Sequence, residues 1–237
     1  MLTCEDLCAG YGRVDVLHGV SLSVRPDELV ALIGPNGAGK TTALRTIVGL
    51  LRPTRGRVAF DGTPLAGSDP ADIVARGIAL VPQGRMIFHT LTVRENLRLG
   101  AYRAPAGEIG GRMQTVLAAF PALADRLGQQ GGTLSGGQQQ MLVIGRALMA
   151  APRIMAIDEP SLGLAPKIID QVYEILARLR AQRKLTLLIV EQSSTRAMMT
   201  GGRMILIRGG RIVLQGEATD MVRDERLKQA YFGFGDH

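Results

Sequence analysis

A glycine-rich segment near the start of the chain has the residue types of a phosphate-binding loop. It consists of Gly34, Pro35, Asn36, Gly37, Ala38, Gly39, Lys40, Thr41 and Thr42, and it fits the pattern G-x-x-x-x-G-K-[ST]. The glycines let the backbone turn so that successive N–H groups face one concavity, while Lys40 supplies a charge for the β- and γ-phosphates. Thr41 is expected to place its hydroxyl on Mg²⁺. The segment predicts a nucleoside triphosphate site, against the alternative of a glycine-rich turn that matches by chance.

Two carboxylates follow an apolar run that is typical of a buried strand. Residues 154–157 lead directly into Asp158, Glu159 and Pro160. Ligands of open α/β sheets bind at the carboxyl ends of the strands, where both acids are expected. Strand alternation predicts that the two side chains point to different sides, with Asp158 at the metal and Glu159 at an attacking water as general base. The alternative is a solvated acidic strand end.

The elements around these motifs alternate between short apolar strands and longer helices. Buried strands are predicted over Leu29–Ile33, Ile78–Val81, 154–157 and 185–190, a helix over 167–180, and a hairpin over 204–214. Strands that alternate with helices indicate an α/β fold with a largely parallel central sheet. Strand patterns disappear over residues 86–150, which we interpret as an inserted helical subdomain.

Composition limits the classes of partner. The 28 Lys and Arg exceed the 21 Asp and Glu, giving +7, which favours anionic partners or simply a solvated basic surface. The chain has no Trp and few other aromatic residues, so stacking platforms for single-stranded nucleic acid are poorly supplied. No apolar run approaches the roughly 18 residues of a membrane span. The first residues lack the pattern of a secretion signal, and none is expected.

The two cysteines, Cys4 and Cys8, are expected on one strand, where they would lie roughly 13 Å apart. A disulfide needs Cα atoms within about 7 Å, so we predict two free thiols in a reducing compartment. Their spacing also does not fit a metal knuckle.

A third motif links the phosphate loop to a known family. Between the loop and the carboxylates lie Leu134, Ser135, Gly136, Gly137 and Gln138. The three motifs in this order resemble the ATP-binding subunits of ABC transporters, and the resemblance covers essentially the whole chain. It implies a single domain over 1–237, with a P-loop NTPase core over about 1–85 and 151–237, an N-terminal antiparallel β part and a helical subdomain over about 86–150. It further implies ATP and Mg²⁺ as ligands, with residues 134–138 meeting the γ-phosphate held by a second subunit.

The resemblance assigns roles to further positions. Tyr11 is similar to the aromatic residue that stacks on adenine, and Gln83 to the glutamine that touches Mg²⁺ and leads to the helical insert. The family usually has a histidine where this chain has Gln192, so Glu159 is expected to act alone as base while Gln192 positions the phosphate. Residues 161–164 lack the usual aspartate, which puts their contact across the dimer in doubt.

Within the family, the segment D-E-P-S-L-G-L-A-P together with Val190-Glu191-Gln192 resembles the shorter ATPase of branched-chain amino acid uptake systems. This implies a peripheral protein on the cytoplasmic face of the inner membrane. Its expected partners are a second ABC ATPase subunit in a head-to-tail, heteromeric dimer, two membrane permease subunits and, indirectly, a periplasmic solute-binding protein. Nucleic acid is not expected.

Three alternatives remain open from the sequence. They are a related urea or amide importer, a soluble ABC ATPase that acts on nucleic acid, and a non-catalytic nucleotide sensor. The basic charge favours the second, while intact Lys40, Asp158 and Glu159 argue against the third.

Overall fold

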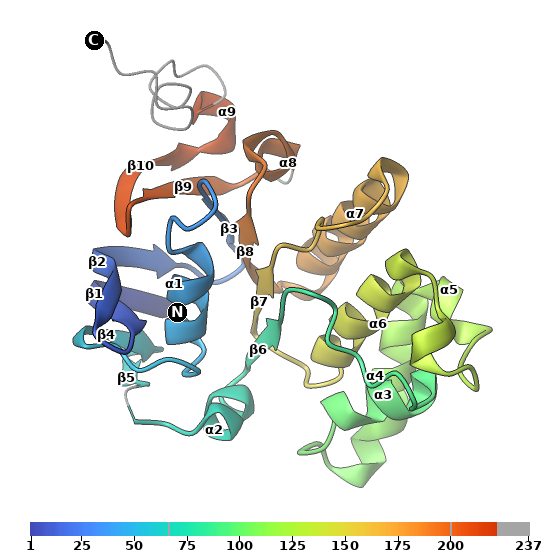
Figure 1. The fold of residues 1–237 in the computed structure, drawn as a ribbon. Coiled ribbons are helices and arrows are strands. Elements are labelled where there is room, and N and C mark those ends of the chain that lie inside the picture. Colours follow the sequence, from blue (N-terminus) through green and yellow to red (C-terminus); the bar gives the residue numbers. More distant parts are fainter. Residues whose placement is uncertain (66, 200, 222–237) are drawn as a thin grey trace. The chain divides into compact units, whose positions relative to one another are not determined.

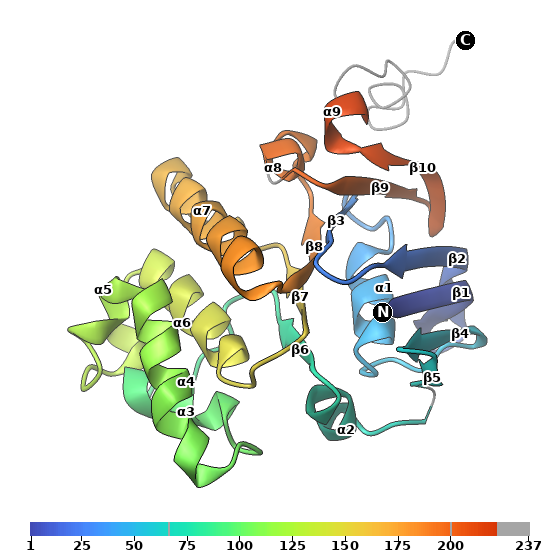
Figure 2. The same ribbon diagram turned by 180° about the vertical axis from the view of Figure 1, so that it is seen from behind.

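The computed structural model describes residues 1–65, 67–199 and 201–221. The chain forms two compact units. Unit 1 comprises Met1–Ile73 and the described part of Thr186–His237, and unit 2 comprises Val74–Leu185. Figures 1 and 2 show the elements from opposite sides. Helix α2 (Pro70–Ala75) spans the boundary between the two units in the sequence.

Unit 1 begins with an antiparallel sheet of order β2-β1-β4-β5. Its strands are β1 (Leu2–Tyr11), β2 (Val14–Val24), β4 (Arg55–Phe60) and β5 (Thr63–Pro64). Strand β1 lies in the middle, where Leu2 pairs with Val24 on one side and Phe60 on the other. These three side chains are buried, so this sheet has one face on the core of unit 1.

The parallel strands of unit 1 are centred on β3 (Leu29–Ile33), between β8 (Thr186–Glu191) and β9 (Arg203–Arg208). All residues of β3 and β8 are buried, as expected for parallel strands covered on both faces. Strand β10 (Arg211–Glu217) returns antiparallel to β9 through Gly209 and Gly210, whose φ angles are 54° and 72°. The helices are α1 (Lys40–Ile47), α8 (Ser194–Met199) and α9 (Ala218–Met221).

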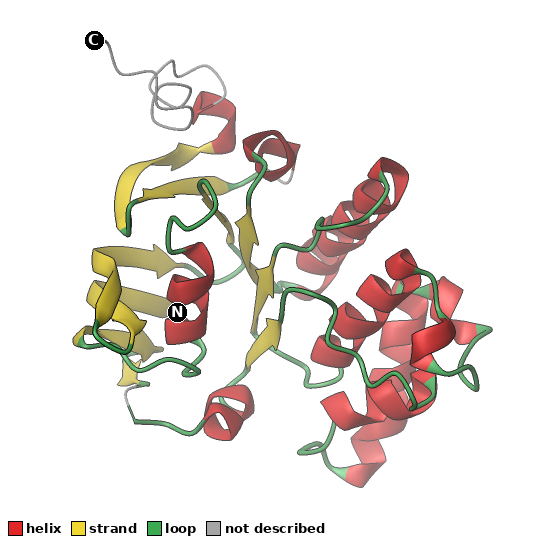
Figure 3. Ribbon diagram, in the orientation of Figure 1, coloured by secondary structure: helices red, strands yellow, loops and turns green. Residues whose placement is uncertain are grey.

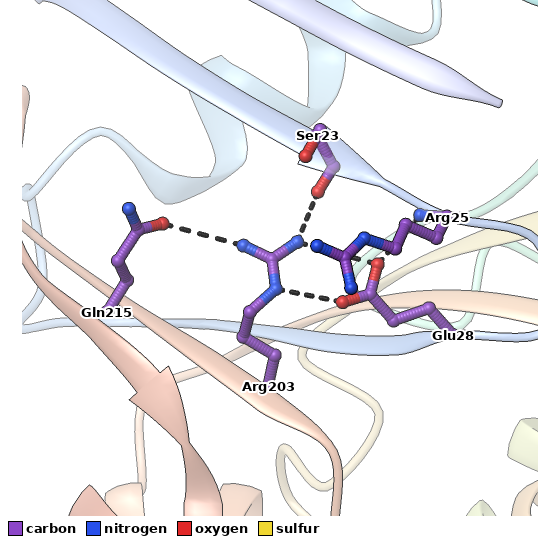
Figure 4. Close-up of polar contacts among 5 residues, drawn as sticks. All are labelled: Ser23, Arg25, Glu28, Arg203 and Gln215. Atoms are coloured by element: carbon purple, nitrogen blue, oxygen red, sulfur yellow. Dashed lines mark hydrogen bonds and ion pairs between the residues drawn. The ribbon is translucent and has the colours of Figure 1, made fainter.

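A polar cluster on unit 1 joins the segment before β3 to the last hairpin (Figure 4). Arg203 Nε donates to Glu28 Oε1 at 2.8 Å, Nη1 donates to Gln215 Oε1 at 3.4 Å, and Nη2 donates to the carbonyl of Ser23. The backbone N–H of Arg25 donates to the second Glu28 oxygen at 2.7 Å. The side chains of Arg203 and Glu28 are only 18% and 15% exposed, so this ion pair is largely removed from solvent.

Unit 2 contains the parallel pair β6 (Ile78–Val81) and β7 (Ile154–Asp158). Its helical elements are α3 (Val93–Gly100), α4 (Ala106–Ala119), α5 (Pro121–Ala124), the 3₁₀ turn Gly131–Thr133, α6 (Gly136–Leu148) and α7 (Pro166–Arg183). Figure 3 shows that the chain between β6 and β7 is helical apart from its loops. At Gly145 of α6, an added Cβ would lie 2.9 Å from Val116 of α4 and 3.1 Å from Leu97 of α3. This glycine therefore lets three helices pack closely.

The predicted α/β fold class is confirmed, including the parallel strands, the N-terminal antiparallel part and the inserted helices. The strand predicted over 185–190 begins one residue later, and β7 includes Asp158. The proposed limits of a single domain and its helical subdomain stay a prediction. Cys4 and Cys8 are free thiols on β1, as predicted. Among the described residues, no helix is long and apolar enough to cross a membrane.

Candidate nucleotide-binding site

The predicted phosphate-binding loop connects β3 to α1 in unit 1. Gly34 has a φ of 154° and lies so close to β9 that an added Cβ would be 2.2 Å from the carbonyl oxygen of Ile207. Gly39 caps α1 with a φ of 104°, a left-handed conformation that favours glycine. Helix α1 begins at Lys40, so its N-terminal amides and positive dipole end belong to the loop.

Two distant segments hold this loop in shape. The N–H of Gly210, in the turn between β9 and β10, donates to the Ala38 carbonyl at 3.0 Å. On the β2 side, an added Cβ at Gly39 would lie 2.9 Å from Leu17. Neither support was predicted from the sequence, although the Gly209-Gly210 pair is typical of a tight turn.

The side chain of Lys40 lies inside the loop. Its ammonium group donates to the carbonyls of Gly34 at 2.7 Å and Pro35 at 3.0 Å, and the residue is 4% exposed. Because the backbone of the loop itself holds the charge, a bound phosphate would replace these neutral carbonyl acceptors with anionic oxygens. Thr41 follows in the first turn of α1 and is half-buried, and Thr42 is buried.

Two further predicted residues lie on unit 1. Tyr11 ends β1, is 47% exposed, and accepts a hydrogen bond at 3.3 Å from Arg45 of α1, the helix that begins with Lys40. Gln192 is exposed and directly follows β8, whose last residue, Glu191, pairs with Ile33 at the base of the loop. Unit 1 thus brings Tyr11, the phosphate loop and Gln192 onto neighbouring elements. Their roles stay predictions.

The predicted carboxylates lie on unit 2, in an arrangement that differs from the expected alternation. Asp158 is the last residue of β7 and is 5% exposed. Glu159 lies beyond the strand with a φ of 48°, so the alternating directions of strand side chains do not apply to it. Its carboxylate Oε2 accepts a hydrogen bond at 3.0 Å from the side-chain amide of Gln83, which follows β6. The structure therefore brings the predicted base and the predicted metal contact Gln83 together.

Residues 134–138, also on unit 2, begin helix α6. Leu134 is buried, Ser135 is the N-cap, and Gly136 and Gly137 are the first two helical residues. Ser135 Oγ accepts from the Gln138 N–H at 3.4 Å, and Gln138 Oε1 accepts from the Ser135 N–H at 3.0 Å. This capping box gives Gln138 a structural role that was not predicted above, although the pattern S-x-x-Q is typical of it.

The predicted ligands fit these residues chemically. The described residues contain no group of three or more His, Cys, Asp and Glu able to hold a metal ion by themselves. The predicted Mg²⁺ contacts, Thr41, Gln83 and Asp158, offer hydroxyl, amide and carboxylate oxygens, the donor types that Mg²⁺ takes alongside phosphate and water. The buried ammonium of Lys40 and the amides at the start of α1 suit a triphosphate. Together, the fold and the loop define a P-loop nucleotide-binding protein.

Comparisons with known proteins define the family. Residues 17–162 match the family model described as ABC transporter. The chain is 41% identical to the high-affinity branched-chain amino acid transport ATP-binding protein BraG of Pseudomonas aeruginosa, over 98% of this chain and 100% of that protein. It is 34% identical to the probable branched-chain amino acid transport ATP-binding protein LivF of Archaeoglobus fulgidus, over the full length of both. This chain belongs to the ABC transporter family and is one of its ATPase subunits.

Solved structures agree with this assignment. An ATP-binding subunit of an ABC transporter superposes with a TM-score of 0.82 at 32% identity, covering 98% of this chain and 96% of that one. A dimeric ATP-binding cassette in a post-hydrolysis state, bound to ADP and phosphate, superposes with a TM-score of 0.81 at 27% identity, covering 92% and 99%.

Proposed function

We propose that this chain hydrolyses ATP with Mg²⁺ to drive a membrane importer of branched-chain or other hydrophobic amino acids. The observation that carries the ATPase part is the glycine-rich loop with the buried Lys40 ammonium at its centre. The amino acid part is supported by the similarity to BraG and LivF over nearly the whole chain.

In this proposal each residue of the site has a defined task. Lys40 and the amides of residues 34–42 bind the triphosphate, and Tyr11 stacks on the adenine. Glu159 takes the proton of the attacking water, and Gln192 positions the γ-phosphate by hydrogen bonding, because an amide cannot carry a proton. Bound Mg²⁺ supplies charge that neutralises the phosphate oxygens, and Thr41, Gln83 and Asp158 are the residues that would hold it.

The proposed assembly is a head-to-tail dimer with a second, related ATPase. The amides at the start of α6 then meet the γ-phosphate that the partner subunit holds. Pairing with a different chain is supported by Pseudomonas aeruginosa, which has BraG and also BraF, a branched-chain amino acid transport ATP-binding protein 30% identical to this chain. Two permease subunits and a periplasmic binding protein complete the importer, with this chain peripheral on the cytoplasmic face of the inner membrane.

Nucleotide binding and hydrolysis test the ATPase part. Lys40→Ala should abolish ATP binding measured by calorimetry, because it removes the charge inside the loop. Glu159→Gln should retain binding but lower turnover by about 10²-fold or more, the scale of a lost general base. Arg94 is an exposed residue on α3, so Arg94→Ala serves as the control. This variant should bind and hydrolyse ATP as the wild type does. Unchanged ATP affinity in the Lys40 variant would overturn the proposed site.

Uptake measurements test the cargo. The full importer, reconstituted in proteoliposomes with its binding protein, should accumulate radiolabelled leucine when ATP is enclosed and should not accumulate urea. Uptake of urea or an amide instead would assign the chain to that related group of importers. Purification of this chain with RNA and without permease subunits would contradict transport altogether.

A further inference from the structure

The loop after β6 has a strained backbone. Gly84, Arg85 and Met86 have successive φ angles of 80°, 66° and 22°, and the Met86 N–H donates to the Gly84 carbonyl at 2.8 Å. Left-handed conformations are unfavourable for residues with a Cβ, so two of these three residues must be held in place by the surrounding structure. The contacts of Arg85 and Met86 therefore identify what stabilises this loop.

Side chains fix this loop from two directions. Arg146 of α6 donates to the Met86 carbonyl at 2.5 Å. Arg85 reaches the opposite way, and its Nη2 donates to the Gly163 carbonyl at 3.0 Å. The strained loop is thus tied by Arg146 to the body of α6 and by Arg85 to the segment that follows β7.

The guanidinium of Arg85 also lies against the start of α6. A Cβ added at Gly136 would be 3.0 Å from Arg85 Nη1, and one added at Gly163 would be 3.3 Å from Nη2. A cation at a helix N-terminus is repelled by the positive end of the helix dipole, so the stability of α6 does not account for this placement. The hydrogen bond to Gly163 and the space left by two glycines do account for it.

The same loop makes a second contact with the segment after β7. Gln83 donates to the Glu159 carboxylate at 3.0 Å, and Glu159 begins a turn closed by the bond from the Leu162 N–H to the Glu159 carbonyl at 3.1 Å. Gln83 therefore holds the start of this turn, and Arg85 holds its far end at Gly163.

We propose that Arg85 is a positioning residue for ATP hydrolysis. Through its hydrogen bond to Gly163 and its position beside Gly136, it sets the turn that carries Glu159 and the start of α6 in fixed relation. Glu159 is thereby held at the γ-phosphate bound by this chain while the start of α6 meets the γ-phosphate held by the partner subunit. The proposal rests on the proposed function. It gives Arg85 a role in hydrolysis, which the sequence alone did not assign to this side chain.

Arg85→Gly gives the sharpest test, because glycine adopts the φ of 66° without strain, so the variant removes the Arg85 side chain without straining the loop. The full-length protein should unfold at the same or a higher temperature than the wild type. Its kcat for ATP should fall by roughly tenfold, the scale of a small misplacement of reacting groups. KM for ATP should stay within about twofold, because the triphosphate is held by residues 34–42.

Two further variants make the outcome unambiguous. Arg85→Lys keeps the charge without the planar pair of donors, so it should restore part of kcat. Arg94→Ala is the arginine control and should leave kcat unchanged. If Arg85→Gly keeps kcat within about twofold of the wild type, the positioning role is wrong. If the wild-type chain has no ATPase activity that depends on Lys40, the proposed function itself is wrong, so the two failures are distinguishable.

Discussion

The side-chain amide of Gln83 lies 3.0 Å from the carboxylate of Glu159 and donates a hydrogen bond to it. Glu159 is held with a φ of 48° just beyond the end of β7, a conformation with a cost of about 1–3 kcal/mol for a residue other than glycine. The proposed base is thus fixed both by its backbone and by a side chain from another loop.

Removing the Gln83 amide should therefore impair hydrolysis more than binding. We expect Gln83→Ala to lower kcat by about tenfold, since the Glu159 carboxylate loses a partner that limits its rotation. Steady-state ATPase assays measure this, and Gln114→Ala, an exposed position on α4, serves as the control. An equal loss in both variants would contradict a specific role for Gln83.

Substitutions at Ser135, the N-cap of α6, distinguish its effect on stability from its proposed contact with phosphate. Ser135→Ala should lower the free energy of unfolding by about 1 kcal/mol, the usual cost of a lost cap, in urea titrations. Ser135→Asp keeps a capping oxygen and should keep that stability. Its added negative charge should nevertheless abolish ATPase activity, since it faces the proposed γ-phosphate contact. An active Ser135→Asp variant would remove residues 134–138 from the site.

The two cysteines should differ in reactivity. Burial raises the pKa of the Cys4 thiol to about 12, whereas Cys8 is only half-buried. Because the thiolate is the reactive form, only about one Cys4 in 10⁴ is ionised at pH 8. Mass spectrometry after iodoacetamide treatment should show one modified thiol in the folded chain and two in guanidinium. The Cys8→Ser variant should remain unmodified while folded, and rapid labelling of that variant would show that β1 opens.

The ion pair between Glu28 and Arg203 should make stability depend on pH. Burial raises the pKa of the Glu28 carboxyl, but the hydrogen bonds from Arg203 and the Arg25 backbone, with the nearby charges, lower it below its ordinary value. A carboxyl with a lowered folded pKa stabilises the fold above its unfolded pKa of about 4.3, and that contribution is lost as the pH falls through the folded pKa.

Glu28→Gln should therefore reduce the free energy of unfolding at pH 7 by about 1.5–3 kcal/mol, the range for a hydrogen bond to a charged group. The difference from the wild type should shrink as the pH is lowered below about 4. Urea titrations at pH 7, 5 and 3.5 measure it. The exposed pair Glu5 and Arg57 provides the control, because Glu5→Gln should have little effect at any of these pH values. A difference that grows with acidity would contradict this assignment.

The parts of the structure that could be predicted from the sequence are those whose pattern lies in adjacent residues. Buried runs such as Leu29–Ile33 and the loop that follows it carry their periodicity and glycine spacing in adjacent residues. The left-handed conformations of Arg85 and Glu159 have no such signal, because residues with a Cβ adopt them only under tertiary constraint. The contact between Gln83 and Glu159 joins loops far apart in the chain, so only the fold could bring it to light.

The strands that flank β3 determine when the phosphate-binding loop can take its shape during synthesis on the ribosome. Both strands that flank β3, and the Gly210 amide that holds the Ala38 carbonyl, come from residues after 185. Residues 34–42 are therefore synthesised long before the strands and the turn that shape them into a phosphate-binding loop. Because a domain folds only after the residues that make its contacts have been synthesised, the chain should bind ATP only when translation is nearly complete. A truncated chain that ends before these strands should therefore not bind ATP, and it should not enter a transporter as an ATP-bound subunit.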